Sequence, residues 1–167
     1  MDRAAVSREM EQARLAFETL TVAATPADLG RRAHNTRWTN RQLLFHQVFG
    51  YLIVRTLMPL VHTLGRLGWS RRFSAALNAM RRPFHVINYL GSCAGAFFLT
   101  PNTMIRLMNR TIAALQRRLA AEPEQDLSLT MRFPPGWDPY FQSTMTVLDV
   151  YHYGTLHFDH HRHQLSY

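Results

Sequence analysis

Histidine side chains are concentrated near the C-terminal end of this chain. Five of its nine histidines lie between positions 152 and 163, and two of them, His157 and His161, are four residues apart. On a helix this spacing places both imidazoles on one face, about one turn apart, where they can bind the same metal ion. The HExxH zinc motif uses the same spacing, but Phe158 stands where that motif has its glutamate. The mechanism of that motif is therefore excluded, while a metal site is not.

A third imidazole from another helix would complete such a site, and His46 is the candidate. It lies in an apolar segment, with Leu43, Gly50 and Ile53 at spacings of three and four residues. Gly50, one turn further on, leaves room for a ligand or for a close helix approach. A histidine on an apolar helix face is more often a hydrogen-bonded core residue, so the segment alone leaves both interpretations open.

Composition restricts the remaining chemistry. All 19 basic residues are arginine, and lysine is absent. This excludes Schiff-base enzymes, pyridoxal-phosphate enzymes and the P-loop, all of which need an amine. The single cysteine, Cys93, excludes a disulfide framework, a CxxC redox pair and a cysteine-rich zinc ribbon. Histidine, carboxylate, tyrosine and one thiol are left.

Other polar residues near the pair have weaker claims. Tyr153 lies one turn before His157 on the same face, which makes it the candidate catalytic residue or hydrogen-bond donor to a ligand; plain packing is the alternative. Asp149 or Asp159 could orient a ligand imidazole, although a surface charge is the commoner role. His160 lies about 100° around the helix from the pair and is expected beside the site or at the surface. The other histidines carry no motif or are expected to face solvent: His34, His62, His85, His152 and His163.

Helices are expected to position these residues. Apolar spacing and capping signals predict them over 7–21, 39–64, 70–80, 101–121 and from 139 to near the end of the chain. Pro59 is expected to kink the second of these or to restart it. Residues 83–99 are expected to be irregular but packed, and 127–133 to be extended. The sequence therefore predicts a single all-α domain over 1–167, a four-helix bundle with an excursion between its second and third helices.

Two segments resemble the motifs of the DinB/YfiT-like superfamily. Residues 37–46 (RWTNRQLLFH) resemble its W-[ST]-x-x-x-[VL]-[LV]-x-H helix, and residues 157–165 (HFDHHRHQL) resemble its C-terminal H-x-x-x-H-R-x-Q-[LIV] helix. The resemblance implies a bundle that holds a divalent metal, nickel, zinc or iron, on His46, His157 and His161. His163 stands where the family often has glycine. Residues 67–99 exceed what a minimal member needs, which implies a lid or an altered pocket.

The resemblance also implies a function. In this family the metal activates water or a low-molecular-weight thiol such as mycothiol or bacillithiol, so we expect a metal-dependent transferase, isomerase or hydrolase with a small-molecule substrate. An arginine cluster near the mouth of the bundle could bind the carboxylates of such a thiol. The family often forms homodimers, for which the apolar residues 84–99 offer a surface.

Two alternatives belong to other classes of protein. The first is a non-enzymatic, metal-bearing bundle with a regulatory or stress-linked role. The second is an arginine-rich nucleic-acid-binding protein, suggested by the net charge of +8 and the isoelectric point near 10.7. No nucleic-acid-binding motif accompanies that charge, so the second is the least favoured.

The segment from Leu43 to Leu64 is the most apolar, but polar residues interrupt it, and no uninterrupted run reaches the ~20 residues of a membrane span. The acidic N-terminus, with Asp2, Glu9 and Glu11, is unlike a signal peptide. We therefore expect a cytoplasmic protein with no membrane partner.

Overall fold

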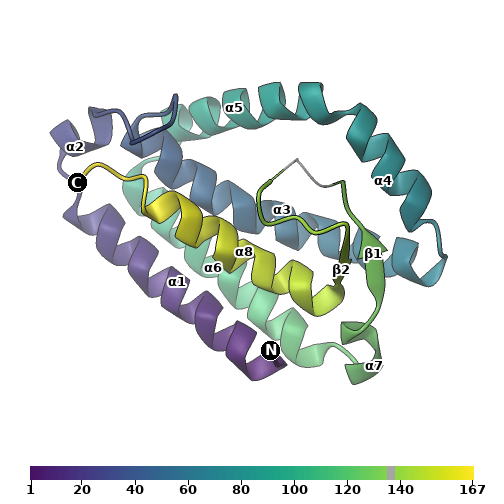
Figure 1. Ribbon diagram of the computed structural model, residues 1–167. Coiled ribbons are helices and arrows are strands. Elements are labelled where there is room, and N and C mark those ends of the chain that lie inside the picture. Colours follow the sequence, from purple (N-terminus) through teal and green to yellow (C-terminus); the bar gives the residue numbers. More distant parts are fainter. Residues whose placement is uncertain (135–137) are drawn as a thin grey trace.

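Four long helices form the body of the protein. The computed structural model describes residues 1–134 and 138–167, with the backbone only at positions 70, 72, 81 and 82. The four helices are α1 (Arg3–Ala23), α3 (Asn40–Arg66), α6 (Pro101–Ala121) and α8 (Val147–Arg162). Both α1 and α3 contact α6 and α8, so the four close into a bundle (Figure 1). The predicted all-α class is confirmed.

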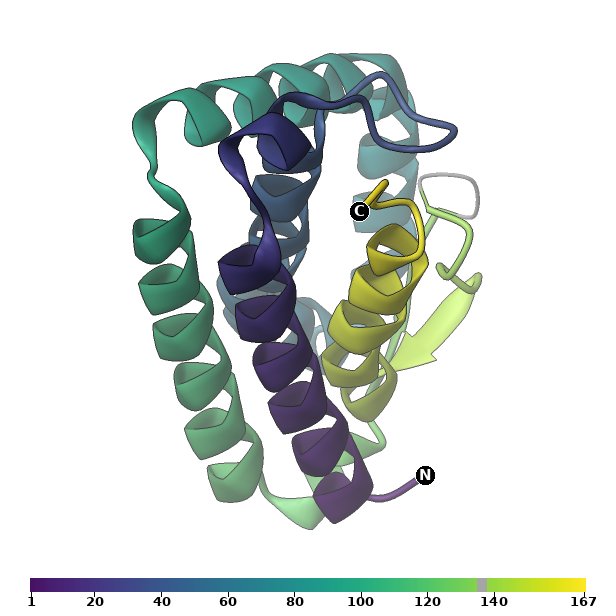
Figure 2. The same cartoon turned by 90° about the vertical axis from the view of Figure 1, so that its left-hand side faces the viewer.

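The remaining elements lie around this bundle. The short helices α2 (Pro26–Gly30) and α7 (Glu124–Leu127) belong to connections, while α4 (Ser70–Ala79) and α5 (Arg81–Phe98) form the excursion. Strand β1 (Thr130–Arg132) pairs antiparallel with β2 (Thr144–Thr146). Helix α5 crosses one end of the bundle in Figure 2 and packs on α3, and α4 contacts β1.

Capping residues fix where the two histidine-bearing helices begin. Thr39 caps α3 in a capping box with Gln42, and Thr146 caps α8 in the same way with Asp149. In each box the threonine hydroxyl accepts an N–H of the first turn, and the acidic or amide side chain accepts the N–H of the threonine. The starting points of α3 and α8 set the rotation at which each helix presents its histidines.

A continuous apolar core joins the four helices. Phe17 of α1, Leu43 and Leu44 of α3, Met108 of α6 and Phe158 of α8 are all fully buried in it. Two further buried side chains, Tyr51 and Thr155, hydrogen-bond to each other across α3 and α8 at 3.0 Å between the hydroxyl oxygens. Burial raises the pKa of Tyr51, so this hydroxyl stays protonated.

Several predicted boundaries were wrong. Residues 83–99 are not irregular, since most of them belong to α5. This helix packs so closely at Gly95 that an added Cβ would lie 2.2 Å from the Phe45 ring. Pro83 falls in the first turn of α5, where a missing N–H costs little. The last helix begins at Val147 rather than at 139, because β2 comes first. Helix α3 continues through Pro59 without a restart.

Helix α3 is the only described helix that is long and apolar enough to cross a membrane by length and composition. More than half of its most apolar stretch, 56%, is buried inside the bundle. A core helix of a soluble protein has this character, so the burial of α3 fits a soluble bundle.

Candidate metal centre

His46 from α3 and His157 and His161 from α8 meet inside the bundle. All three are buried, and one ligand nitrogen of each lies within 4.8 Å of the others. The ring centroids are 4.9 Å apart for His46 and His157, 4.6 Å for His46 and His161, and 4.5 Å for His157 and His161. The cluster therefore joins His46 to two histidines that follow it by 111 and 115 positions in the chain.

Each of the three imidazoles has its Nδ1 atom held by a different oxygen. His46 Nδ1 lies 3.2 Å from Ser92 Oγ, whose own proton is donated to the carbonyl of Asn88 at 2.8 Å. His157 Nδ1 lies 3.0 Å from a carboxylate oxygen of Asp138. His161 Nδ1 lies 2.7 Å from the side-chain oxygen of Gln164. All three oxygens accept, so all three Nδ1 atoms carry the proton and donate it.

This arrangement leaves a lone pair on each Nε2 atom. The Nε2 atoms of His46 and His161 are only 3.2 Å apart, although neither then has a proton to share. The Nε2 atom of His157 is buried and has no hydrogen-bond partner among the described residues. Buried nitrogens without partners are costly, so these Nε2 atoms are expected to bind a further group that accepts their lone pairs.

The electrostatics favour the neutral form of the ring, which is the form that binds metals. Burial, and then the neighbouring His157 and His161, hold the pKa of His46 well below its usual value. Burial and His157 lower the pKa of His161 to about 3. Both rings are therefore neutral at pH 7, with lone pairs available.

The cluster fits a metal ion by its geometry and by its donors. Two nitrogens that each lie about 2.0–2.1 Å from a tetrahedral zinc ion are roughly 3.3–3.4 Å apart. The separation of 3.2 Å between the Nε2 atoms of His46 and His161 is close to that value. A metal would also give the buried Nε2 of His157 the partner that it lacks, and the three Nδ1 contacts are of the kind that orients metal-bound histidines.

Asp138 is the carboxylate that orients His157, a role that Asp149 and Asp159, the alternatives considered from the sequence, do not have. Asp149 belongs to the capping box of α8, and Asp159 pairs with Arg162 at 3.1 Å. Burial alone would raise the pKa of Asp138, but the hydrogen bonds that its carboxylate accepts, with that from His157 the largest, outweigh burial and lower that pKa. Asp138 is therefore ionised and accepts from His157.

The hydroxyl of Tyr153 is directed at this carboxylate. Its oxygen lies 3.0 Å from Asp138 Oδ2 and 3.4 Å from His157 Nδ1. Burial and the charge of Asp138 raise the pKa of Tyr153 well above its usual value, so the hydroxyl stays protonated and donates. In this geometry Tyr153 positions Asp138, and a direct contact with a ligand remains a prediction.

A cavity of about 580 Å³ adjoins the three histidines. Helices α3, α4, α5 and α8 and the segment around Phe133 and Phe141 supply its walls. Trp38 forms part of the wall and stacks on His46, with ring centroids 4.3 Å apart. Most of the lining is apolar, including Phe49, Ile53, Leu57, Leu77, Phe84 and Phe141. The excursion therefore contributes directly to the cavity.

A comparison with protein families agrees with this picture. A model of the DinB superfamily matches residues 9–165, nearly the whole chain. The chain belongs to the DinB superfamily. No curated protein and no solved structure matches it significantly. The buried histidine cluster fits a metal-binding DinB protein.

Two residues around the cluster could have been found from the DinB motifs, and two could not. Trp38 and Gln164 occupy motif positions, and here they stack on His46 and hold His161. Ser92 and Asp138 belong to segments without a motif, and only the packing of α5 and of the chain before β2 brings them to His46 and His157. His160 also lines the cavity and contacts Tyr140.

The other histidines of this DinB protein lie elsewhere. His34, His85 and His163 are exposed, and His152 is partly buried against Glu9, with 2.8 Å between its Nδ1 and the carboxylate. His62 is buried and belongs to a second cluster with Glu122 and Asp126, for which the sequence contains no motif. It lies sixteen residues along α3 from His46, about 24 Å away at 1.5 Å per residue.

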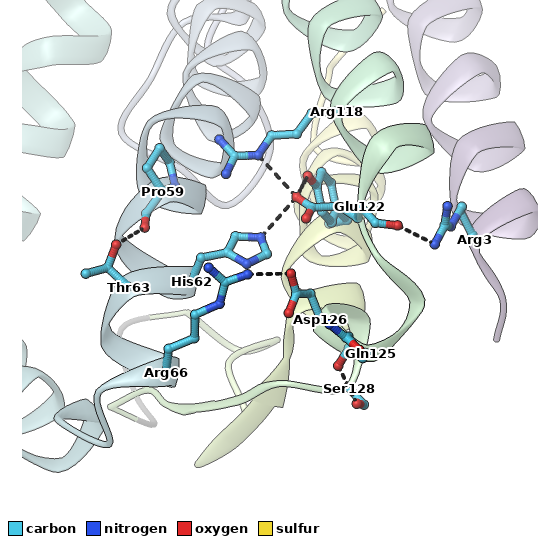
Figure 3. A network of polar contacts seen from close by, with 11 residues as sticks. Arg3, Pro59, His62, Thr63, Arg66, Arg118, Glu122, Gln125, Asp126 and Ser128 are labelled. Carbon is cyan, nitrogen blue, oxygen red and sulfur yellow. Dashed lines mark hydrogen bonds and ion pairs between the residues drawn. The ribbon is translucent and has the colours of Figure 1, made fainter.

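Cationic and hydroxyl groups already satisfy the carboxylates of this second cluster (Figure 3). One oxygen of Glu122 accepts from His62 at 3.0 Å, from Tyr151 at 2.9 Å and from Arg118 at 3.2 Å. Asp126 pairs with Arg66 at 2.6 Å. A metal ion would have to displace these partners, so the cluster is an ion-pair network that joins α3 to the end of α6.

Proposed function

We propose that this DinB protein is a metal-dependent transferase or hydrolase, with a divalent ion held by His46, His157 and His161. The observation that carries the proposal is the convergence of three buried imidazoles. The Nε2 atom of His157 has no partner among the described residues, and the Nε2 atoms of His46 and His161 lie 3.2 Å from each other. Nickel, zinc and iron all accept imidazole ligands. Its location would be the cytoplasm, which agrees with the burial of α3.

Three histidines leave coordination positions open, and an ion bound there would lower the pKa of a bound water or thiol and polarise a substrate carbonyl. The protein's own groups prepare the site for this. Asp138, Ser92 and Gln164 hold the three Nδ1 protons and so fix the direction of each Nε2. Tyr153 donates to Asp138 and keeps that carboxylate in place.

Two further features support chemistry rather than storage of a metal. The histidines border a cavity large enough for a small-molecule substrate. His160 lines that cavity without belonging to the cluster, and an imidazole there offers a place for the proton that water or a low-molecular-weight thiol must lose. Its ring contacts Tyr140, with 3.4 Å between His160 Nδ1 and the hydroxyl oxygen.

Metal analysis of untagged protein tests the site. We expect about one divalent ion per chain in the wild type and none in His46→Ala. The matched control is His163→Ala, which removes an exposed histidine just beyond α8 and should keep the metal. Wild-type protein without metal after growth and dialysis in zinc, nickel and iron would refute the proposal.

Activity then separates an enzyme from a passive binder. Thiol transfer is measured with a low-molecular-weight thiol and monochlorobimane, and hydrolysis with a p-nitrophenyl ester. We expect one of the two reactions with the loaded wild type and neither with His46→Ala. Bound metal with no turnover in either assay would favour the non-enzymatic, metal-bearing bundle.

The predicted homodimer is a further proposal, and the outer face of α5 supports it. Val86, Ile87, Leu90, Phe97 and Phe98 are all exposed on this helix, Phe97 and Phe98 by 78% each. Helical spacing places them within about a third of its circumference. Such an apolar patch is typical of an interface. Analytical ultracentrifugation should give a dimer for the wild type and a monomer for Leu90→Glu.

A further inference from the structure

The cavity beside the three histidines has walls that are poor in charge. Of the described residues that line it, none is an arginine, and the one carboxylate, Asp138, is already engaged by His157 and Tyr153. Apart from these and the histidines, the clearly polar lining side chains are Thr56 and Asn88. Apart from an ion held by the three histidines, no described lining group offers the cation that a carboxylate or phosphate would need when it leaves water.

Two polar atoms of lining residues nevertheless lack a partner within the described protein. They are the side-chain oxygen Oδ1 of Asn88 and the indole Nε1–H of Trp38, both buried. A buried polar atom without a partner is costly, so such atoms often mark the place where a ligand binds. One of the two accepts a hydrogen bond and the other donates one.

Both residues lie at the metal-centre end of the cavity. Trp38 stacks on His46. The backbone carbonyl of Asn88 accepts the hydroxyl of Ser92, which in turn holds His46. A ligand that satisfied Asn88 and Trp38 would therefore have its polar group near His46 and its remaining atoms among the apolar walls.

We propose that this cavity binds an uncharged, largely apolar small molecule, whose single hydroxyl or similar donor group hydrogen-bonds Asn88 at the three-histidine end. The cavity volume of about 580 Å³ is in the range of ligand sites that enclose most of a small molecule. The proposal rests on the proposed function in one respect only, that the polar group of the ligand lies next to the metal-binding histidines. It disfavours a hydrophilic, carboxylate-bearing thiol such as bacillithiol as the occupant of this cavity.

The test uses the uncharged fluorescent probe N-phenyl-1-naphthylamine and its displacement by straight-chain alcohols, on metal-free and metal-loaded protein. Affinity should rise about fourfold for each added CH₂ group from 1-butanol to 1-octanol. On the metal-free protein, heptanoate should bind at least tenfold more weakly than 1-heptanol, because no described wall residue offers its charge a partner. Equal or tighter binding of heptanoate would overturn the proposal.

Variants locate the probe and the donor contact. Ile53→Trp fills the cavity and should weaken probe binding at least tenfold, whereas Leu60→Trp, on the same helix but outside the lining, should not. In the wild type, 1-heptanol should bind about tenfold tighter than its isomer 1-methoxyhexane, which has no donor. Asn88→Leu should remove that difference. An unchanged difference in Asn88→Leu would overturn the role of Asn88.

The exposed face of α5 is the competing site for an apolar probe, and Phe97→Ser controls for it. Loss of probe binding in Phe97→Ser, with Ile53→Trp unaffected, would place the probe on the surface and overturn the proposal. Alcohol binding is measured without metal as well as with it. A protein that binds alcohols but no metal would refute the proposed function alone, and one that binds metal but no alcohol would refute this inference alone.

Discussion

Gly50→Ala is the substitution that most directly tests whether His157 is held for a metal. Gly50 lies one turn after His46, where α3 passes close to α8. An added Cβ would be 2.5 Å from Cδ2 and 3.0 Å from Nε2 of His157, whereas ordinary carbon contacts begin near 3.4 Å. The imidazole must therefore move by about 1 Å, and its hydrogen bond to Asp138 opposes that movement.

The two effects of this substitution have opposite signs. Alanine is about 1 kcal/mol better than glycine inside a helix. Overpacking a filled site costs about 1–3 kcal/mol, so the net loss in the free energy of unfolding should be about 0–2 kcal/mol. Metal binding should suffer more, since ligand positions tolerate only about 0.2 Å. We expect a loss of 10–100-fold in affinity, the size seen when the groups that orient a ligand are removed.

Gly91→Ala is the matched control. It is also a glycine inside a helix, α5, but an added Cβ there meets nothing within 4 Å. It should raise the free energy of unfolding by about 1 kcal/mol, a shift of roughly 3 °C in Tm, and leave metal affinity unchanged. Zn²⁺ affinity is measured by competition with a chromophoric chelator, and folding by circular dichroism. A folded Gly50→Ala protein with wild-type Zn²⁺ affinity would show that the packing of His157 does not matter for binding.

Three further predictions concern the residues around the two buried clusters. Asp138→Asn should lower Zn²⁺ affinity 10–100-fold in the same competition assay, while Asp159→Asn, at a half-buried residue that pairs with Arg162, should not. Metal-free protein should lose stability as the pH falls from about 6.5 toward 3. The pKa values of His46 and His161 are lowered by folding, so the unfolded chain takes up these protons first. Urea unfolding at a series of pH values should show a slope of up to about 1.4 kcal/mol per pH unit for each ring, and a flat profile from pH 7 to pH 4 would contradict the buried, neutral histidines. Glu122→Ala should cost about 3–5 kcal/mol in urea unfolding, because it leaves buried partners without their carboxylate. The same variant should keep its metal, and loss of the metal would contradict the separation of the two clusters.

Local signals in the sequence determined much of this fold. Helical spacing of apolar residues and the threonine caps at Thr39 and Thr100 indicated the bundle helices, because these interactions lie within a few residues of each other. The same reasoning failed for residues 83–99. Gly91, Gly95 and Pro83 are poor helix formers, and it is the close packing of Gly95 on Phe45 that makes the helix favourable there.

The candidate site divides in the same way. The spacing of His157 and His161 and the DinB motifs were sufficient to single out three histidines, since helix geometry fixes which side chains share a face. Only the tertiary structure decided which oxygens hold them. Asp138 and Ser92 come from segments without a local pattern and reach His157 and His46 through contacts between distant parts of the chain. The apolar character of the cavity was likewise decided by the packing of α4 and α5 opposite α3, because sequence periodicity cannot say which apolar side chains face a cavity rather than another helix.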